Sequence, residues 1–224
     1  MIRALIFDFN GVLADDDPIH MEALRKVAKE EGMSFTDEEY LDKYLPLNDW
    51  DCFKLLFEEH ALTSSKLDDL IRRKSVYYFQ AIAEKSVLFP DAAEAVRAAV
   101  SRCPLAIASG ARMDEIRHIL IHGNLQTCFK AIISAEDVKF GKPHPEPFLR
   151  AYEKLKEKDS SLRVSECVAI EDSIGGIQSA HEAGMRCLAI AHSYGPDRLQ
   201  SAGPEWIIDS IAEFAEWLEK EVSK

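Results

Sequence analysis

The sequence lacks the cysteine pairs and the long hydrophobic runs of a secreted or membrane-spanning protein. Its five cysteines are odd in number, widely spaced and form no C-x-x-C pair, which argues against a disulfide framework or a cysteine metal site. Cys103, Cys167 and Cys187 lie in or beside apolar runs, so we expect buried free thiols. The apolar run near the N-terminus is too short for a signal peptide or a membrane span. These absences favour a cytoplasmic protein with no membrane partner.

Positive charge is also scarce in this sequence. Lysine and arginine together number 27, against 39 aspartates and glutamates, which gives a net charge of -12. Such a chain is poorly suited to binding nucleic acid, because phosphate contacts need lysine and arginine. It is compatible with a bound divalent cation. With 224 residues, 47% of them hydrophobic, the chain can form one sizeable core or a core domain with a smaller insert.

The stretch over residues 4–17, ALIFDFNGVLADDD, is the most informative part of the chain. Its apolar start predicts a short strand buried on both faces, as in parallel sheets. The strand ends at Asp8, and Asn10 and Gly11 then turn the chain. Open α/β sheets bind their ligands at this position, so Asp8 is a candidate functional carboxylate. The acidic run at 15–17 is expected to be a solvated hinge.

A helical block follows, from residue 18 to about residue 84. Apolar residues recur at helical spacing as far as Gly32, which is a typical helix stop. Thr36 and Glu39 form a capping-box pattern for a second helix. Two further helices are predicted over 50–59 and 64–84. The block contains no convincing strand, so we expect a helical insert that follows the first strand.

After Pro90 the chain alternates between strands and helices. Strands are expected at 105–108, 131–133, 167–170, 187–191 and 206–208. Helices are expected at 91–102, 112–121, 146–156, 174–183 and 211–222. This alternation predicts an α/β fold with a parallel, doubly wound sheet and right-handed crossovers.

Four of the predicted strands are followed by polar groups, which should converge at one edge of a parallel sheet. These groups are Asp8 and Asn10, Ser109 and Gly110, Lys142, and Glu171 and Asp172. Carboxylates suit Mg²⁺, which is often held by one or two carboxylates together with a substrate phosphate. The lysine, the hydroxyl and the turn amides suit the phosphate itself.

With these motifs, the sequence resembles the haloacid dehalogenase-like hydrolase superfamily. It is most similar to the branch with a small helical cap, which contains phosphoglycolate phosphatase-like and beta-phosphoglucomutase-like enzymes. The matching motifs are Asp8-Phe9-Asn10-Gly11-Val12, Ser109-Gly110, Lys142-Pro143, Glu171-Asp172-Ser173 and the glycine-rich segment 175–184. The resemblance covers essentially the whole chain. It implies a Rossmann-like catalytic core formed by residues 1–14 and 88–224, and a helical cap over 15–87.

The resemblance also implies a mechanism and a set of site residues. Asp8 would be the nucleophile that becomes an aspartyl phosphate. Mg²⁺ would be held by Asp8, the Asn10 backbone carbonyl and Asp172, with Glu171 as a ligand through water or an orienting group. Phosphate would be bound by Lys142, Ser109 and the amides of Gly110 and Gly11. The expected partner is a small phosphorylated metabolite, and we expect a monomer.

Asn10 is the departure from the family pattern, because most phosphatases and mutases of the superfamily have a second aspartate there. That aspartate protonates the leaving oxygen and then activates water or the accepting hydroxyl. Asparagine can form hydrogen bonds but cannot exchange a proton at neutral pH. General acid–base catalysis contributes on the order of 10²–10⁴-fold, so we predict attenuated turnover or a substrate with a good leaving group.

The cap should select the substrate, and its candidate residues are His20, Asn48 and Lys74. His20 is either a partner in proton transfer near Asn10 or a structural residue on a helix face. Lys74 resembles a substrate-facing cap lysine, but a solvated lysine beside two arginines is the favoured alternative. Trp50 occupies the position where mutase relatives often have an arginine. A bisphosphate intermediate needs a second anion site, so Trp50 weakens the mutase interpretation.

Two functions besides metabolite phosphatase stay open on the sequence. One is a phosphosugar mutase of the beta-phosphoglucomutase type. The other is a catalytically weak protein that binds a phosphorylated ligand, which Asn10 suggests. A dehalogenase is disfavoured because Glu171 and Asp172 are present. A phosphonate hydrolase is disfavoured because nothing around Lys43 supports a Schiff-base lysine.

Overall fold

The computed structural model describes residues 1–45, 47–60, 67–83 and 85–222. The chain divides into two compact units. The first, which we call the core unit, consists of Met1–Asp15 and Leu88–Lys224. The second, the helical unit, consists of Asp16–Val87. The boundary between the first segment of the core unit and the helical unit falls one residue later than expected from the sequence.

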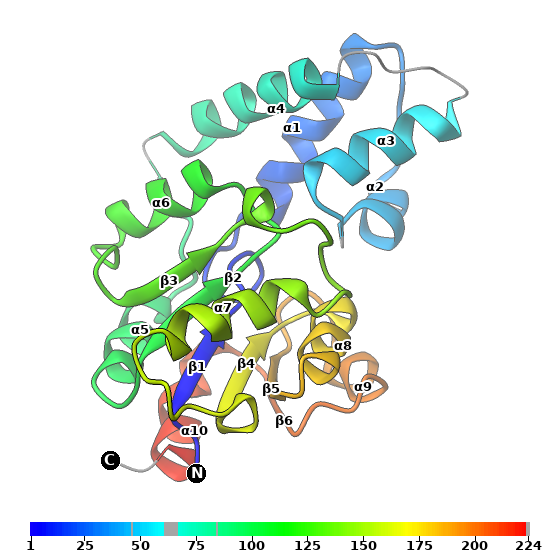
Figure 1. Ribbon diagram of the computed structural model, residues 1–224. Helices are drawn as coiled ribbons and strands as arrows, with labels where there is room; N and C mark the ends of the chain where they lie inside the picture. Colours follow the sequence, from blue (N-terminus) through cyan, green and yellow to red (C-terminus); the bar gives the residue numbers. More distant parts are fainter. Residues whose placement is uncertain (46, 61–66, 84, 223–224) are drawn as a thin grey trace. The chain divides into compact units, whose positions relative to one another are not determined.

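The core unit is organised around a six-stranded sheet in which every pairing is parallel (Figure 1). Its order is β3-β2-β1-β4-β5-β6. The strands are β1 (Ala4–Phe7), β2 (Leu105–Ala108), β3 (Phe129–Ile133), β4 (Cys167–Glu171), β5 (Arg186–Ile190) and β6 (Trp206–Ile208). The predicted parallel α/β fold is therefore confirmed. β1 pairs with both β2 and β4, so the strand order reverses direction beside β1, and such switch points are where α/β sheets bind ligands.

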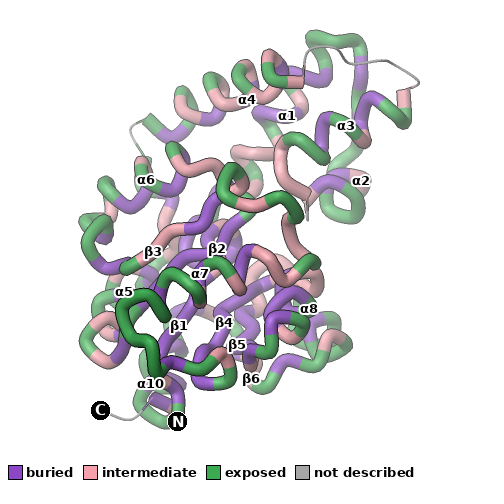
Figure 2. The backbone as a smooth tube through the Cα atoms, viewed as in Figure 1, coloured by how far each residue is buried: buried purple, intermediate pink, exposed green. Residues whose placement is uncertain are grey.

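The central strands are buried because helices cover both faces of the sheet. Figure 2 shows these strands as buried, whereas exposed and intermediate residues are common in the connections between elements. The helices α7 (Glu146–Lys156) and α8 (Ile174–Glu182) pack on the face that includes Ala4 and Ile6. On the other face, Phe7 contacts Phe214 of α10 (Phe214–Glu221) with ring centroids 5.6 Å apart. Continuous apolar strands are the sequence signature of this double coverage.

The remaining elements of the core unit show where sequence patterns lose precision. They are α5 (Ala92–Val100), α6 (Met113–His122), α9 (Pro196–Gln200) and short 3-10 helices over Ala135–Asp137, Val164–Glu166 and Ile211–Glu213. The short helix α9 was not predicted, since five residues are too few to show a helical period. Strand β3 begins two residues before its predicted start, because the exposed Lys130 interrupts the apolar run.

The helical unit contains α1 (Asp17–Glu30), α2 (Asp37–Glu39), a π-helical turn over Tyr40–Tyr44, α3 (Asp49–Glu59) and α4 (Leu67–Ile82). The capping box predicted for α2 is present, because Thr36 and Glu39 bond each other's backbone N–H groups. The unit has its own aromatic core, with Tyr44 and Phe53 fully buried. Both ends of the helix predicted over 64–84 lie outside the described residues.

The five cysteines are all free and buried, as predicted. Among the described residues, no helix is both long enough and apolar enough to cross a membrane.

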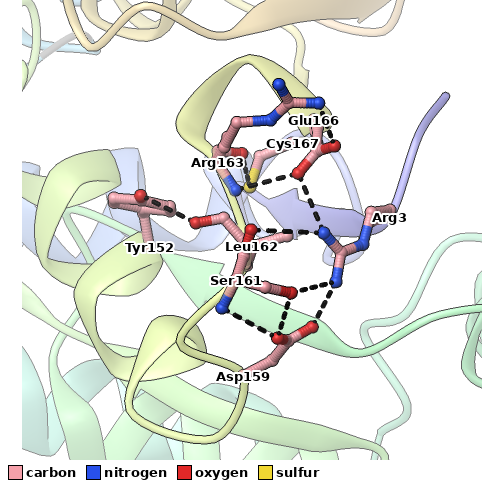
Figure 3. Close-up of polar contacts among 8 residues, drawn as sticks. All are labelled: Arg3, Tyr152, Asp159, Ser161, Leu162, Arg163, Glu166 and Cys167. Carbon is pink, nitrogen blue, oxygen red and sulfur yellow. Dashed lines mark hydrogen bonds and ion pairs between the residues drawn. The ribbon is translucent and has the colours of Figure 1, made fainter.

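An ion-pair cluster ties the start of β1 to the segment between α7 and β4 (Figure 3). The Arg3 guanidinium lies 2.5 Å from Asp159 Oδ2 and 3.1 Å from Glu166 Oε2. Glu166 also accepts hydrogen bonds from the backbone N–H and the guanidinium of Arg163. These Arg163 contacts lower the pKa of Glu166 from 4.5 to about 2, and Arg3 contributes in the same direction. Between about pH 2 and pH 4.5, Glu166 is therefore ionised in the folded protein but protonated in the unfolded chain.

We expect Glu166→Gln to destabilise the protein at neutral pH but to lose this effect in acid. A lowered pKa in the folded state means that the ionised Glu166 contributes stability above 4.5 and loses it as pH falls toward about 2. Chemical denaturation at a series of pH values would measure the gap between variant and parent. Glu182→Gln, at an exposed position on α8, is the control. The assignment would be contradicted if the difference in unfolding free energy between Glu166→Gln and the parent stayed constant as pH falls below 4.5.

Candidate active site

The first strand ends in a tight loop that presents Asp8. The Asp8 backbone N–H donates to the carbonyl of Ile170 at 2.8 Å, which continues the β1–β4 pairing to the catalytic candidate. The Gly11 N–H then donates to Ala14 O at 2.8 Å, closing the turn. Gly11 has φ +72°, a left-handed conformation that residues with a Cβ rarely adopt. The loop geometry therefore depends on the glycine that the sequence provides.

Lys142 joins two carboxylates that come from neighbouring strands. Its ammonium lies 2.8 Å from Asp8 Oδ1 and 2.5 Å from Glu171 Oε1. The Asp8 and Lys142 side chains are about seven-eighths buried, and Glu171 is fully buried. Strand pairing fixes the two carboxylates, because Phe7 and Ile170, the residues before them, are register partners. The sequence prediction that these residues converge agrees with this geometry.

Glu171 is held by the protein at both oxygens. Oε1 accepts from Lys142, while Oε2 accepts from the backbone N–H groups of Asp172 and Ser173 and from the Ser173 hydroxyl. The Ser173 hydroxyl also caps α8 by accepting from Gly176 N–H at 3.0 Å. A carboxylate engaged in this way is suited to positioning Lys142.

Burial shapes the charge state of the cluster. Burial is the largest influence on the pKa of Asp8, and it raises this pKa. The charge of Glu171 raises the pKa further, whereas the charge of Lys142 lowers it. For Lys142, burial alone would lower the pKa, but Asp8 and Glu171 outweigh burial and raise it. The lysine therefore stays charged, whereas Asp8 needs additional positive charge to be fully ionised at neutral pH.

The same edge of the sheet offers a donor set for a metal ion. Oxygens of Asp8, Glu171 and Asp172 all lie within 4.8 Å of one another. Carboxylate oxygens suit a hard cation such as Mg²⁺, and a cation here would supply the positive charge that Asp8 needs. The residues therefore fit a divalent cation.

Ser193, in the loop after β5, was not singled out from the sequence. Its hydroxyl donates a hydrogen bond to Asp172 Oδ2. The Nδ1 of the neighbouring His192 lies 2.8 Å from the Gly11 carbonyl. No motif marks this loop, so only the tertiary structure shows that it contacts the site.

The second predicted motif also lies beside the first. The Ser109 hydroxyl is 3.4 Å from Asn10 Oδ1, and it accepts a hydrogen bond from Ala111 N–H at 3.0 Å. Ser109 is 2% exposed, whereas Gly110 is exposed at the end of β2. A phosphate bound here would meet a hydroxyl and backbone N–H groups.

Two of the predicted substrate residues of the helical unit, His20 and Lys74, belong to one network within that unit. Lys74 donates to His20 Nδ1 at 2.7 Å and also pairs with Asp49. Since an ammonium can only donate, Nδ1 of His20 is the acceptor, and its Nε2–H faces Asp16 Oδ2 at 3.3 Å. Tyr78 donates to the same Asp16 oxygen.

This network corrects two expectations. Lys74 is not a solvated lysine, because it is only 3% exposed, and its charge is matched by Asp49. Asp16 is not a solvent residue of the hinge, because it is fully buried with Tyr78 and His20 as partners. Asn48 has a structural role, since its side chain caps α3 by accepting from Asp51 N–H at 3.0 Å. Trp50 is 47% exposed.

Gly176 provides the space that Glu171 occupies. A Cβ at Gly176 would lie 1.9 Å from Glu171 Cδ, and the buried carboxylate would have to move. We expect Gly176→Ala to destabilise the protein by about 1–3 kcal/mol, a typical overpacking cost, and to displace Lys142 from its position.

The neighbouring glycine supplies a matched control for this prediction. A Cβ at Gly175 would meet no atom within 4 Å, so Gly175→Ala should leave stability unchanged or improve it. Thermal unfolding of the two variants and the parent tests the pair. Equal unfolding midpoints for the two alanine variants would contradict the tight fit at Glu171.

Comparison with known proteins agrees with this fold. A family model described as haloacid dehalogenase-like hydrolase matches residues 5–190, and the chain belongs to this family. Among its relatives is the phosphorylated carbohydrates phosphatase of Thermotoga maritima, 28% identical over 95% of this chain and 99% of that protein. The fructose-1-phosphate phosphatase YqaB of Escherichia coli is 27% identical over 81% of this chain and 92% of that protein.

A solved structure extends the similarity to three dimensions. CbbY from Rhodobacter sphaeroides, an aspartate-to-asparagine variant in complex with xylulose-1,5-bisphosphate, superposes with a TM-score of 0.83. It is 25% identical, and the match covers 95% of this chain and 96% of that chain.

Proposed function

We propose that the protein is a Mg²⁺-dependent phosphatase of a small phosphorylated carbohydrate, which acts through a covalent phosphate on Asp8. The observation that carries the proposal is the chain of contacts from Asp8 through Lys142 to Glu171, with Asp172 beside it. A nucleophilic carboxylate, a fixed ammonium and a cation site are the groups that phosphoryl transfer from an ester needs.

In the first step, an Asp8 oxygen would attack phosphorus and the bond from phosphorus to the ester oxygen would break. The leaving alkoxide must gain a proton. In the second step, water would attack the acyl phosphate, lose a proton and release inorganic phosphate and the free carboxylate. Lys142 would remain charged throughout and offset the charge on Asp8 and the phosphoryl oxygens.

A bound Mg²⁺ would neutralise charge between the nucleophile and the phosphate. Asp8, Asp172 and the Asn10 carbonyl would hold it, and Glu171 would keep Lys142 in place. Ser109, with the N–H groups of Gly110 and Gly11, would bind the phosphoryl oxygens.

Asn10 limits this mechanism at both proton transfers. Its amide cannot protonate the alkoxide or accept a proton from water, so both protons would be exchanged with solvent. We therefore infer slow turnover, and accumulation of the acyl phosphate wherever the second step is slower than the first. A substrate with a good leaving group would suffer least.

The substrate class is inferred from the relatives. Two are named as phosphatases of phosphorylated carbohydrates and of fructose 1-phosphate, and the structural relative is in complex with a sugar bisphosphate. The experiment is a screen of sugar phosphates and small-acid phosphates with Mg²⁺, measuring phosphate release, in parallel with the metal-free protein. Release that requires Mg²⁺ supports the proposal, and equal release without the metal would contradict it.

The second candidate is a binding protein for a phosphorylated ligand, favoured by Asn10 itself. The asparagine variant in the CbbY structure holds its bisphosphate ligand, so an Asp-to-Asn change in a relative is compatible with binding. A single-turnover assay for acid-labile phosphate on Asp8 separates the two functions. Ligand binding with neither a phosphoenzyme nor phosphate release would favour the binding protein. Transfer of phosphate to a second sugar phosphate, instead of water, would indicate a mutase.

A further inference from the structure

The loop after β5 reaches the active site from a strand that contributes no predicted catalytic residue. Two consecutive residues of this loop, His192 and Ser193, each contact a different part of the site. We call them the β5-loop pair. Ser193 contacts the carboxylate of Asp172, and His192 contacts the backbone of the nucleophile loop at Gly11.

Ser193 and Asp172 meet in a space that depends on Gly11. A Cβ at Gly11 would lie 2.0 Å from Asp172 Oδ2 and 2.9 Å from Ser193 Oγ. The missing side chain thus lets three loops converge: those after β1, β4 and β5. The Ser193 hydroxyl donates to Asp172 Oδ2, and this hydrogen bond restrains rotation of the Asp172 carboxylate about its Cβ–Cγ bond.

His192 is held by contacts at both nitrogens and on its ring face. Nδ1 donates to the Gly11 carbonyl at 2.8 Å, since a carbonyl can only accept. The Ile211 backbone N–H donates to Nε2 at 3.3 Å, so the ring carries its proton on Nδ1. Phe89 stacks on the imidazole with centroids 4.0 Å apart and planes 27° apart. A ring held in this way can fix the peptide between Gly11 and Val12, one residue beyond Asn10 in the same loop.

We propose that the β5-loop pair positions the cation site, with Ser193 orienting Asp172 and His192 fixing the loop that carries Asp8 and the Asn10 carbonyl. This inference rests on the proposed Mg²⁺-dependent function, and it assigns the pair a positioning role without contact with substrate. A restraint on Asp172 is needed because carboxylates that lie close together repel one another. Three carboxylates lie within 4.8 Å of one another, and without a restraint their repulsion would turn Asp172 away from the others.

The test is the affinity of the protein for Mn²⁺, which takes the same oxygen ligands as Mg²⁺ and is counted directly by its magnetic resonance signal. Ser193→Ala is expected to raise the Kd for Mn²⁺ by about 10- to 100-fold, the usual effect of losing a group that orients a metal ligand. Ser193→Thr keeps the hydroxyl and should retain most of the affinity. His192→Phe keeps the stack on Phe89 but removes the N–H to Gly11, and should also raise the Kd.

Ser201→Ala is the matched control, because the Ser201 hydroxyl is exposed and donates to Arg198 O in its own helix turn. Its Kd should equal that of the parent. If the parent, Ser193→Ala and His192→Phe all bind Mn²⁺ equally well, the positioning role of the β5-loop pair is overturned. The proposed metal-dependent function is not affected by that result. Failure of the parent to bind Mn²⁺ would overturn the metal-dependent function and the inference with it. Loss of affinity in Ser193→Ala that Ser193→Thr restores would support the positioning role, since a merely misfolded loop would not recover.

Discussion

Asp8→Asn is expected to abolish phosphate release and to leave the protein folded. Removing a covalent nucleophile costs on the order of 10⁴- to 10⁶-fold in kcat, because the remaining groups cannot form the intermediate. The amide has nearly the shape of the carboxylate, so the contacts of the loop should persist. Phosphate release with the substrate identified by the screen measures the effect.

Stability is the control for this variant. Burial raises the pKa of Asp8 from 3.8 to about 7, so the metal-free protein loses stability as pH rises from 3.8 to about 7, and the loss is complete above that value. Removing the charge should therefore not lower the thermal midpoint of the metal-free protein at neutral pH. Lys142 keeps Glu171 as a partner. Activity within tenfold of the parent would exclude Asp8 as the nucleophile.

Asn10→Asp is expected to raise turnover, by about 10²- to 10⁴-fold if proton transfer limits the parent. The new carboxyl group could give a proton to the leaving oxygen and take one from water. The acyl phosphate should then accumulate less in the variant than in the parent. Steady-state phosphate release and acid quenching of the phosphoenzyme measure these two effects separately.

Asn10→Ser is the matched control, since it keeps the backbone carbonyl but adds no group that titrates near neutral pH. It should not be faster than the parent. Equal or lower rates for Asn10→Asp than for the parent would refute the view that position 10 limits the reaction. Ser109 is the neighbour to monitor, because its hydroxyl lies 3.4 Å from Asn10 Oδ1 and would contact the new carboxylate.

Much of the fold followed from local sequence patterns. The four-residue apolar run of β1 is buried on both faces, and double burial leaves no polar alternation in the sequence. The capping box at Thr36 is an entirely local device, so it was predicted correctly. By contrast, α9 has five residues and β3 contains an exposed lysine, and neither gives a clear period.

The helical unit contains two charged residues whose burial the neighbouring sequence did not indicate. Lys74 follows two arginines, and such a run usually marks a solvated face. Its burial depends on Asp49 and His20, which lie 25 and 54 residues away in the sequence. Asp16 likewise belongs to an acidic run but is buried against Tyr78, 62 residues away. Contacts between residues so far apart in the chain cannot be predicted from a short stretch of sequence.

By itself, the sequence determined the parallel sheet and the convergence of Asp8, Ser109, Lys142 and Glu171, because each follows a strand or its connecting loop and parallel strands end at one edge. It also determined that position 10 holds an amide. Only the tertiary structure decided how the carboxylates are restrained. Glu171 depends on the space left by Gly176, and Asp172 on a serine that follows another strand. These contacts arise where loops pack in three dimensions, and packing of that kind has no period in the sequence.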